Sequence, residues 1–303
     1  MSKRDFLRLG DLTLAEAREV LSLAGKLKGE SHGARSGALA GHSVAIVLEK
    51  ASTRTRVSFE VGCSQLGAHP VVLGEQGSQL GRGEPIRDTA RVLSRYCDAI
   101  VYRTSAHARL AEMATASVPV VNALTDDGHP VQVLCDVFTV EEQLGRSIAG
   151  KRIAFVGDCG CNMARSWLEA APLFGFHLVL AGPPDYMPPP AEVRAAGAHA
   201  TTTHDPASAA AGCDVVNTDV WASMGQEAQA AARRKAFAGW MVDERMLQKA
   251  RPDAIVLHCL PAHRGEEIDD ATLEGPRSRV WDQAENRLHV QKALLLWLLQ
   301  PSR

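Results

Sequence analysis

Short apolar runs alternate along the chain with longer segments whose apolar residues recur at helical spacing. Each run has the length of a buried strand, and segments such as 14–29 (LAEAREVLSLAGKLKG) and 163–175 (MARSWLEAAPLFG) show the helical period. This alternation predicts an α/β fold, with mainly parallel sheets flanked by helices. The predicted strands are SVAIVL (43–48), PVVLG (70–74), DAIVYR (98–103), VPVVNAL (118–124), RIAFVGD (152–158), HLVLAG (177–182), CDVVNTDV (213–220) and DAIVLHCL (253–260).

The same pattern indicates where the chain divides. A length of 303 residues favours about two domains. The predicted helix PVQVLCDVFTVEEQLG (130–145) starts with Pro130, a favourable first helical residue, and ends at Gly145. A strand begins again at Arg152, so we expect a boundary near residues 145–151. The last segment, ENRLHVQKALLLWLL (285–299), is predicted to be a helix with one strongly apolar face.

Composition narrows the class of protein. The chain is 46% hydrophobic and 22% charged, and its net charge of -2 provides no field that would attract nucleic acid or an acidic membrane. The seven cysteines include no CxxC pair, which favours free thiols in a reducing cytoplasm. MSKRDFLRLG lacks the apolar run of a signal peptide, and ALLLWLL (293–299) is too short to span a bilayer. We therefore expect a cytoplasmic protein.

The segment STRTR (52–56) places two arginines in the predicted first turn of a helix. Helix N-termini carry partial positive charge, so cations are ordinarily disfavoured there. A bound anion would resolve this conflict, because backbone N–H groups, the hydroxyls of Ser52, Thr53 and Thr55, and the fork of Arg54 are all donors. The pattern is consistent with a phosphate site, and equally with an ordinary solvated helix cap.

Further polar residues lie near the ends of predicted strands, where open α/β sheets bind ligands. Arg103 ends the strand DAIVYR, and His129 and Gln132 flank the start of the helix at Pro130. A neutral histidine in that position can donate a hydrogen bond to a carbonyl oxygen. A surface arginine and a simple helix cap are the alternative interpretations.

In the second half, Asp219 follows one predicted strand and Cys259 ends another. The loop after RIAFVG lacks the GxGxxG spacing of a dinucleotide site. Cysteines 159, 161 and 259 and His258 match no zinc spacing, so structural thiols are favoured over a metal.

Taken together, the motifs identify a resemblance. They are, in chain order, STRTR (52–56), GSQLG (77–81), YRT (102–104), HPVQ (129–132), DVWASMGQE (219–227), HCLPAHRGEE (258–267) and ENR (285–287). The sequence resembles the aspartate/ornithine carbamoyltransferase family from about residue 5 to residue 300, and SMG with HCLP is similar to its ornithine carbamoyltransferases.

The resemblance implies a reaction and an architecture. The carbamoyl group of carbamoyl phosphate passes to the side-chain amine of L-ornithine, giving L-citrulline and phosphate in arginine metabolism, without metal or cofactor. Residues 1–148 bind carbamoyl phosphate, residues 149–284 bind ornithine, and the helix within 285–303 packs back on the first domain. It also implies a homotrimer, or a multiple of trimers, with active sites at subunit interfaces.

The resemblance also assigns residues to roles. Those expected to bind carbamoyl phosphate are Ser52, Thr53, Arg54, Thr55, Leu260 and, from the neighbouring subunit, Gln79. Those expected to act on the reacting groups are Arg103, His129, Gln132, Cys259 and Arg287. Those expected to bind ornithine are Asn162, Asp219, Ser223 and Met224, with Asp219 pairing with its α-ammonium group.

One departure and several alternatives accompany this assignment. The family usually has two adjacent asparagines after its glycine–aspartate turn, whereas Cys161 replaces the first here and only Asn162 remains. A sister carbamoyltransferase acting on N-acylated ornithine, putrescine or aspartate is the nearest alternative. A nucleotide-binding oxidoreductase and a non-catalytic protein with the same fold are more distant ones.

Overall fold

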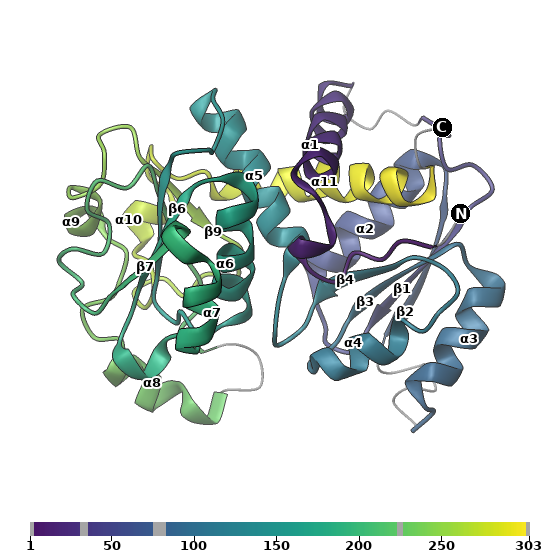
Figure 1. The fold of residues 1–303 in the computed structure, drawn as a ribbon, viewed down its shortest axis with the longest axis horizontal. Coiled ribbons are helices and arrows are strands. Elements are labelled where there is room, and N and C mark those ends of the chain that lie inside the picture. The colour runs from purple at the N-terminus through teal and green to yellow at the C-terminus, as the bar shows by residue number, and fades with distance from the viewer. Residues whose placement is uncertain (1–2, 31–35, 75–82, 223–226, 301–303) are drawn as a thin grey trace. The chain divides into compact units, whose positions relative to one another are not determined.

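The computed structural model describes residues 3–30, 36–74, 83–222 and 227–300. The chain forms two compact units, one of residues 1–135 with 285–303 and the other of residues 136–284 (Figure 1). The boundaries between them fall inside two helices, α5 (Pro130–Leu144) and α11 (Val280–Leu299).

The first unit is built on a four-stranded parallel sheet in the order β2-β1-β3-β4. Its strands are β1 (Ser43–Leu48), β2 (His69–Gly74), β3 (Ala99–Arg103) and β4 (Val120–Leu124). Its complete helices are α1 (Leu14–Gly29), α2 (Thr53–Leu66), α3 (Ile86–Tyr96) and α4 (His107–Met113). A short 3₁₀ turn, Leu9–Asp11, precedes α1.

Alternate residues of each strand in this sheet pack on opposite faces, as the period of two requires. Ala45 and Val47 of β1 join one buried cluster with Leu93 of α3 and Met113 of α4. The predicted helical segment 285–299 belongs to the first unit and lies on the side of the sheet that also carries α2 (Figure 1). Its Lys292 ammonium donates to the Gln65 side chain of α2, so this predicted packing of the C-terminal helix is confirmed.

The second unit contains a five-stranded parallel sheet in the order β7-β6-β5-β8-β9. Its strands are β5 (Arg152–Val156), β6 (His177–Ala181), β7 (Ala200–Thr203), β8 (Val215–Thr218) and β9 (Ile255–His258). Its helices are α6 (Asn162–Phe174), α7 (Pro190–Ala195), α8 (Ala230–Ala236), α9 (Glu244–Leu247) and α10 (Asp270–Leu273). Short 3₁₀ turns span Pro184–Tyr186, Gly197–His199 and Glu227–Gln229.

One face of this second sheet is covered by an aromatic cluster. Val156 of β5 and Val216 of β8 pack in it with Trp221, Phe237 and Trp240. The rings of Trp221 and Phe237 stack with centroids 5.4 Å apart. This cluster fixes the segment that follows β8, which includes Asp219.

Both sheets have a point at which the strand order reverses. In the first unit the chain runs from β1 to the neighbouring edge strand β2 and then returns to β3 on the other side of β1. In the second unit it runs outward from β5 through β6 to β7 and returns to β8 beside β5. The carboxyl ends of the strands at such switch points are where open α/β sheets place ligands. The relevant pairs are therefore β1 with β3, and β5 with β8.

All eight predicted strands are present, and the α/β fold class is confirmed. The structure adds β7, and it begins α11 at Val280, five residues before the predicted start. None of the helices in the described ranges combines the length and the apolar character needed to cross a membrane.

Candidate active site

The first turn of α2 is shaped by its own hydroxyl side chains. Ser52 is the N-cap, and its Oγ accepts the Thr55 amide at 3.3 Å. The Ser52 hydroxyl also donates to Thr55 Oγ1 at 3.0 Å. Thr55 is fully buried whereas Thr53 is exposed. The cap therefore places a buried hydroxyl at the carboxyl end of β1, beside the switch point of the first sheet.

Guanidinium groups from different parts of the sequence converge on this hydroxyl. Arg103 Nη1, from the end of β3, lies 3.5 Å from Thr55 Oγ1, and Arg287 Nη2, from α11, donates to it at 3.1 Å. Both arginine side chains are buried. Arg54 Nε is also buried and finds no hydrogen-bond partner among the described residues. The site thus collects positive charge around the N-terminal end of a helix, an arrangement that favours a bound anion.

Arg56 does not take part, contrary to the expectation that both arginines of STRTR face an anion. Its side chain is 58% exposed and pairs with Glu60 one turn later, Nε to Oε2, at 3.3 Å. Residues one and two positions apart on a helix point in different directions, so only one of the two arginines can face the site. The unfavourable interaction between a positive side chain and the positive end of the helix is therefore offset by Glu60 for Arg56. For Arg54, no such ion pair within the described ranges offsets this interaction.

His129 lies among these same guanidinium groups and is buried. Burial holds the pKa of its imidazole well below the usual range, and the positive charges of Arg287, Arg103 and Arg54 lower this pKa further. The imidazole is therefore neutral at pH 7 and carries one N–H donor. Gln132 is fully buried in the first turn of α5, where its backbone N–H donates to the His129 carbonyl at 3.0 Å.

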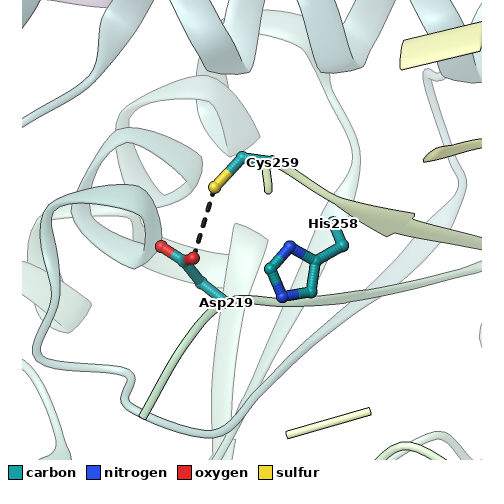
Figure 2. A group of neighbouring side chains, drawn as sticks. All are labelled: Asp219, His258 and Cys259. Carbon is teal, nitrogen blue, oxygen red and sulfur yellow. Dashed lines mark hydrogen bonds between the residues drawn. The ribbon is translucent and has the colours of Figure 1, made fainter. Parts of the chain in front are cut away.

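In the second unit, Asp219 follows β8 and faces Cys259 at the end of β9 (Figure 2). Cys259 Sγ donates to Asp219 Oδ1 at 3.3 Å, and the Val220 amide donates to the same oxygen at 2.8 Å. Burial raises the pKa of the Asp219 carboxyl above its ordinary value. A cation bound beside this group would stabilise its charged form.

His258 lies beside this pair and holds the next residue of the chain. Its Nδ1 accepts the Leu260 amide at 2.8 Å, and its Nε2 lies 3.1 Å from Oε1 of the fully buried Glu267. Leu260 has a φ of 61°, a left-handed conformation that is unusual for a residue with a side chain. The histidine–glutamate pair therefore supports a strained backbone position next to Cys259.

Within the part of the chain that the structure describes, two groups of side chains have the composition of metal sites, namely Asp219 with His258 and Cys259, and His263 with Glu266 and Glu267. In the first, both ring nitrogens of His258 are already engaged by Leu260 and Glu267. In the second, Glu266 pairs with Arg234 at 2.9 Å. In both groups, side chains that could hold a metal therefore already bind other groups of the protein.

The loop after β5 carries Asn162, the first residue of α6, with Cys161 as the N-cap. Burial and the nearby carboxylates of Asp158 and Asp219 raise the pKa of the Cys161 thiol well above its ordinary value, so this residue is uncharged at neutral pH. Gly157 at the start of the loop has a φ of 118°, which suits glycine. Asn162 and Asp219 both follow strands of the switch point of the second sheet: Asn162 begins the helix after β5, and Asp219 comes directly after β8.

A buried ion pair connects this loop with the segment after β8. Arg233 Nη1, from α8, lies 2.6 Å from Asp158 Oδ2 and donates to the Trp221 carbonyl at 2.7 Å. Its guanidinium also lies over the ring of Tyr186, 5.0 Å from the centroid. One side chain therefore joins the loop that carries Asn162 to the segment that carries Asp219.

Three of the predicted site residues, Gln79, Ser223 and Met224, lie outside the described residues. Among the others, the structure brings Ser52, Thr55, Arg103, His129 and Arg287 together in the first unit. It brings Asp219 and Cys259 together in the second.

Sequence reasoning did not assign roles to several residues that shape these groups, namely Glu49, Asp158, Arg233, His258 and Glu267. Glu49 directly follows β1, and Asp158 lies two residues after β5. Their positions at the switch points of the two sheets could have identified them as candidate site residues. Arg233 contacts Asp158 across 75 positions of the sequence, and only the fold reveals this contact. Glu267 ends the motif HCLPAHRGEE, nine positions after the His258 that it contacts.

Comparison with known proteins agrees with this geometry. Residues 4–142 match the family model described as aspartate/ornithine carbamoyltransferase, carbamoyl-P binding domain, and residues 149–298 match its Asp/Orn binding domain. The chain is 71% identical to the ornithine carbamoyltransferase of Sorangium cellulosum (strain So ce56), over 99% of this chain and 98% of that protein. It is 56% identical to the ornithine carbamoyltransferase of Acidothermus cellulolyticus, over 98% of this chain and 96% of that protein.

Solved structures give the same result. The ornithine carbamoyltransferase from Pyrococcus furiosus superposes with a TM-score of 0.93 and 44% identity, covering 100% of this chain and 99% of that chain. The enzyme from Thermus thermophilus superposes with a TM-score of 0.90 and 42% identity, covering 98% of this chain and 99% of that one. With both family domains matched in order along nearly its whole length, the chain belongs to the aspartate/ornithine carbamoyltransferase family.

Proposed function

We propose that the protein transfers the carbamoyl group of carbamoyl phosphate to the side-chain amine of L-ornithine, giving L-citrulline and phosphate. The observation that carries this proposal is the cluster of Arg54, Arg103 and Arg287 at the N-terminal end of α2, around the buried Thr55 hydroxyl. A dianionic phosphate is the ligand that this concentration of donors and positive charge favours. The 71% identity with a protein named ornithine carbamoyltransferase supports ornithine as the acceptor.

We assign carbamoyl phosphate to residues 1–148 with the C-terminal helix segment 285–303. The proposed phosphate ligands are Ser52, Thr53, Arg54, Thr55 and, from a neighbouring subunit, Gln79. The proposed contacts of the carbamoyl group are Arg103, His129, Gln132 and Arg287, joined by Leu260, which lies outside these two ranges. A neutral His129, which burial and the neighbouring guanidinium groups favour by lowering its pKa, acts as a hydrogen-bond donor to the carbamoyl oxygen.

The chemistry follows from where charge develops. The amine lone pair attacks the carbonyl carbon, a C–N bond forms, and negative charge grows on the carbamoyl oxygen. The bond to the phosphate oxygen then breaks, phosphate leaves with the electron pair, and the amine nitrogen loses a proton. Donors fixed in place before the reaction stabilise both negative centres, and removing one such donor typically costs about 3–4 kcal/mol in the barrier.

The nucleophile must be an uncharged amine. An alkyl amine such as that of lysine has a reference pKa of about 10.4, so deprotonation at pH 7 costs roughly 4–5 kcal/mol. Positive charge near the reacting centre lowers the pKa of a nearby amine and so reduces this cost. The same guanidinium groups therefore both hold the phosphate and favour the reactive form of the acceptor.

We assign ornithine to residues 149–284. In this assignment Asp219 pairs with the α-ammonium group, which would offset the burial that raises the pKa of its carboxyl. Asn162 and the Ser223–Met224 backbone hold the carboxylate end, and Cys259 lies next to the reacting amine. N-acylated ornithine and putrescine have no α-ammonium group for Asp219, and aspartate would require cations for a second carboxylate. The named relatives favour ornithine over all three.

We further infer a homotrimer, or a multiple of trimers, working in arginine metabolism in the cytoplasm. Exposed apolar side chains on two helices of the first unit support self-association: Val57 (50% exposed) and Val61 on α2, and Val92 and Tyr96 (74% exposed) on α3. All seven cysteines lie within the described residues and none is in a disulfide, as expected in a reducing compartment. Light scattering coupled to gel filtration tests the assembly, and a monomeric mass would contradict it.

The decisive experiment for the activity is citrulline formation by the purified protein. Carbamoyl phosphate is held constant while L-ornithine, N-acetyl-L-ornithine, putrescine and L-aspartate are supplied in turn. We expect turnover with ornithine and at least a hundredfold lower kcat/KM with the other three, because buried polar groups left unpaired reject a wrong substrate strongly. Faster carbamoylation of any other amine would refute the assignment.

A further inference from the structure

Glu49, the residue directly after β1, collects a set of hydrogen bonds that the proposed reaction does not use. Its carboxylate accepts the hydroxyls of Tyr102 and Thr104, the residues on either side of Arg103. Arg109, on α4, adds a two-point contact, with Nε 3.0 Å and Nη2 2.6 Å from the two carboxylate oxygens. The Glu49 side chain is only 13% exposed, so these contacts are largely removed from water. Four donors therefore converge on one carboxylate beside the switch point of the first sheet.

The backbone at this point is irregular. The pairing of β3 with β4 shifts register here: Tyr102 pairs with Asn122 but Arg103 pairs with Leu124, so the extra residue, Ala123, lies on β4 beside Arg103. An extra residue of this kind disrupts the hydrogen-bond ladder locally, so the end of β3 is held less by β4 than by its other contacts. The Glu49 amide donates to the Arg103 carbonyl at 3.0 Å, so the same residue holds this irregular position through its backbone as well.

Strand geometry connects these contacts with the cluster of Arg54, Arg103 and Arg287. Successive side chains of a strand point to opposite faces, so Tyr102 and Thr104 point away from Arg103. Fixing both neighbours by Glu49 leaves Arg103 directed to the other face, where its Nη1 lies 3.5 Å from Thr55 Oγ1. A change at Glu49 is therefore transmitted to Arg103 without any contact between Glu49 and the substrate.

The charge of Glu49 explains the presence of Arg109. An unpaired carboxylate three residues before Ser52 would repel a phosphate at the N-terminal end of α2 and compete with it for nearby guanidinium groups. The two-point contact from Arg109 neutralises that carboxylate with a cation from outside the cluster.

We propose that Glu49 and Arg109 are positioning residues for carbamoyl phosphate, which together fix the end of β3 that carries Arg103 and keep the arginine cluster available for the phosphate. This inference rests on the proposed function, because it assigns a purpose to the geometry of the same anion site. The two residues act through Arg103 and do not touch the substrate.

Three variants separate this role from a general effect on folding. Glu49→Gln keeps the shape of the side chain but removes the charge that four donors share. Arg109→Met keeps the carboxylate and removes its partner, at a side chain that is 38% exposed and so tolerates change. Glu16→Gln is the matched control, because Glu16 of α1 also pairs with an arginine, Arg4, at 2.7 Å and with a threonine hydroxyl, Thr13, at 2.9 Å, outside the cluster.

The measurements are carbamoyl phosphate affinity by calorimetric titration, kcat and both KM values, and the melting temperature. Small displacements of catalytic groups can lower rates by about a hundredfold. We expect Glu49→Gln and Arg109→Met to lose 10- to 100-fold in kcat/KM for carbamoyl phosphate while the KM for ornithine stays within twofold. Combining the two changes should restore part of the affinity lost in Arg109→Met, since the uncompensated carboxylate is then gone.

Several outcomes would overturn the inference. One is a folded Glu49→Gln protein with unchanged carbamoyl phosphate affinity and kcat. Another is an equal loss in Glu16→Gln. If Glu49→Gln does not fold, an unaltered Arg109→Met protein is sufficient to reject the role. A wild-type protein that binds carbamoyl phosphate but makes no citrulline would refute the proposed function alone, and the titrations would still decide the inference.

Discussion

At the scale of single residues, His129 shows how burial next to positive charge determines protonation. In the unfolded chain a histidine has a pKa of about 6.5, whereas in the folded protein the pKa of His129 lies well below that value. Below about pH 6.5 the unfolded state therefore binds a proton that the folded state does not, and stability falls as the pH is lowered. We expect His129→Gln to flatten the fall in melting temperature between pH 7 and pH 5.

The measurement is a series of thermal unfolding scans without substrate. His69→Gln, a change of the same type at an exposed position of β2, serves as the control. If wild type and His129→Gln lost stability in parallel across this range, the imidazole would not be a buried neutral group.

A second prediction separates the two arginines of STRTR. Arg54 faces the anion site, and charge-assisted hydrogen bonds contribute about 1.5–3 kcal/mol each. Arg54→Ala should therefore weaken carbamoyl phosphate binding by about 10- to 150-fold. Arg56 is exposed and pairs with Glu60, an arrangement that contributes only about 0.3–0.5 kcal/mol, so Arg56→Ala should change binding by less than about threefold. Equal losses in the two variants, measured by titration, would contradict the observed orientation of the helix.

At the scale of elements, α8 stabilises the second unit through one side chain. Arg233 pairs with Asp158 in the interior, and removing one member of a buried pair typically costs about 3–5 kcal/mol because the other charge is left unpaired. We expect Arg233→Met to lower the free energy of unfolding by about that amount in urea titrations. The adjacent Arg234→Met is the control, since the 59% exposed Arg234 pairs with Glu266 near the surface and should cost less than about 1 kcal/mol.

The double variant Asp158→Asn/Arg233→Met completes this experiment. Because the two groups form one unit, the double change should cost clearly less than the sum of the two single changes. Additive losses would mean that the 2.6 Å contact does not contribute to stability as a pair.

Most elements were predictable from sequence because buried parallel strands form continuous apolar runs. Thr201 and Thr202 of β7 are exposed at the edge of the sheet, so this strand lacked the apolar run on which the prediction depended. The start of α11 was placed late because the prediction followed the apolar face of residues 285–299 and did not use Ser278, whose Oγ accepts the Val280 amide at 3.4 Å. Local pattern also placed Arg54 and Arg56 in one turn but could not decide which of them faces inward.

At the scale of the whole molecule, most residues predicted for the two substrates fall in separate units, although Leu260, predicted to bind carbamoyl phosphate, lies in the second. Ser52–Thr55, Arg103, His129 and Arg287 belong to the first, and Asn162, Asp219 and Cys259 to the second. The motifs made this division predictable, because strand ends at switch points collect the polar residues. Glu49 follows a strand and Glu267 ends a motif, but the contacts that make them supporting residues, across 60 and 9 positions of the sequence, have no local signature.

This division leads to a prediction for Asp219→Asn. The variant should raise the Kd for ornithine by about 10- to 150-fold, the equivalent of one charge-assisted contact, and leave the affinity for carbamoyl phosphate within twofold. Burial raises the pKa of the Asp219 carboxyl, so its ionised form destabilises the folded protein, and replacing it with a neutral amide should leave the melting temperature unchanged or higher. Asp185→Asn, at an exposed position of the same unit, is the control and should alter neither affinity. Equal losses of both substrates in titrations of Asp219→Asn would show that the two units do not bind them separately, because a defect confined to the end of β8 would then have reached the arginine cluster of the other unit.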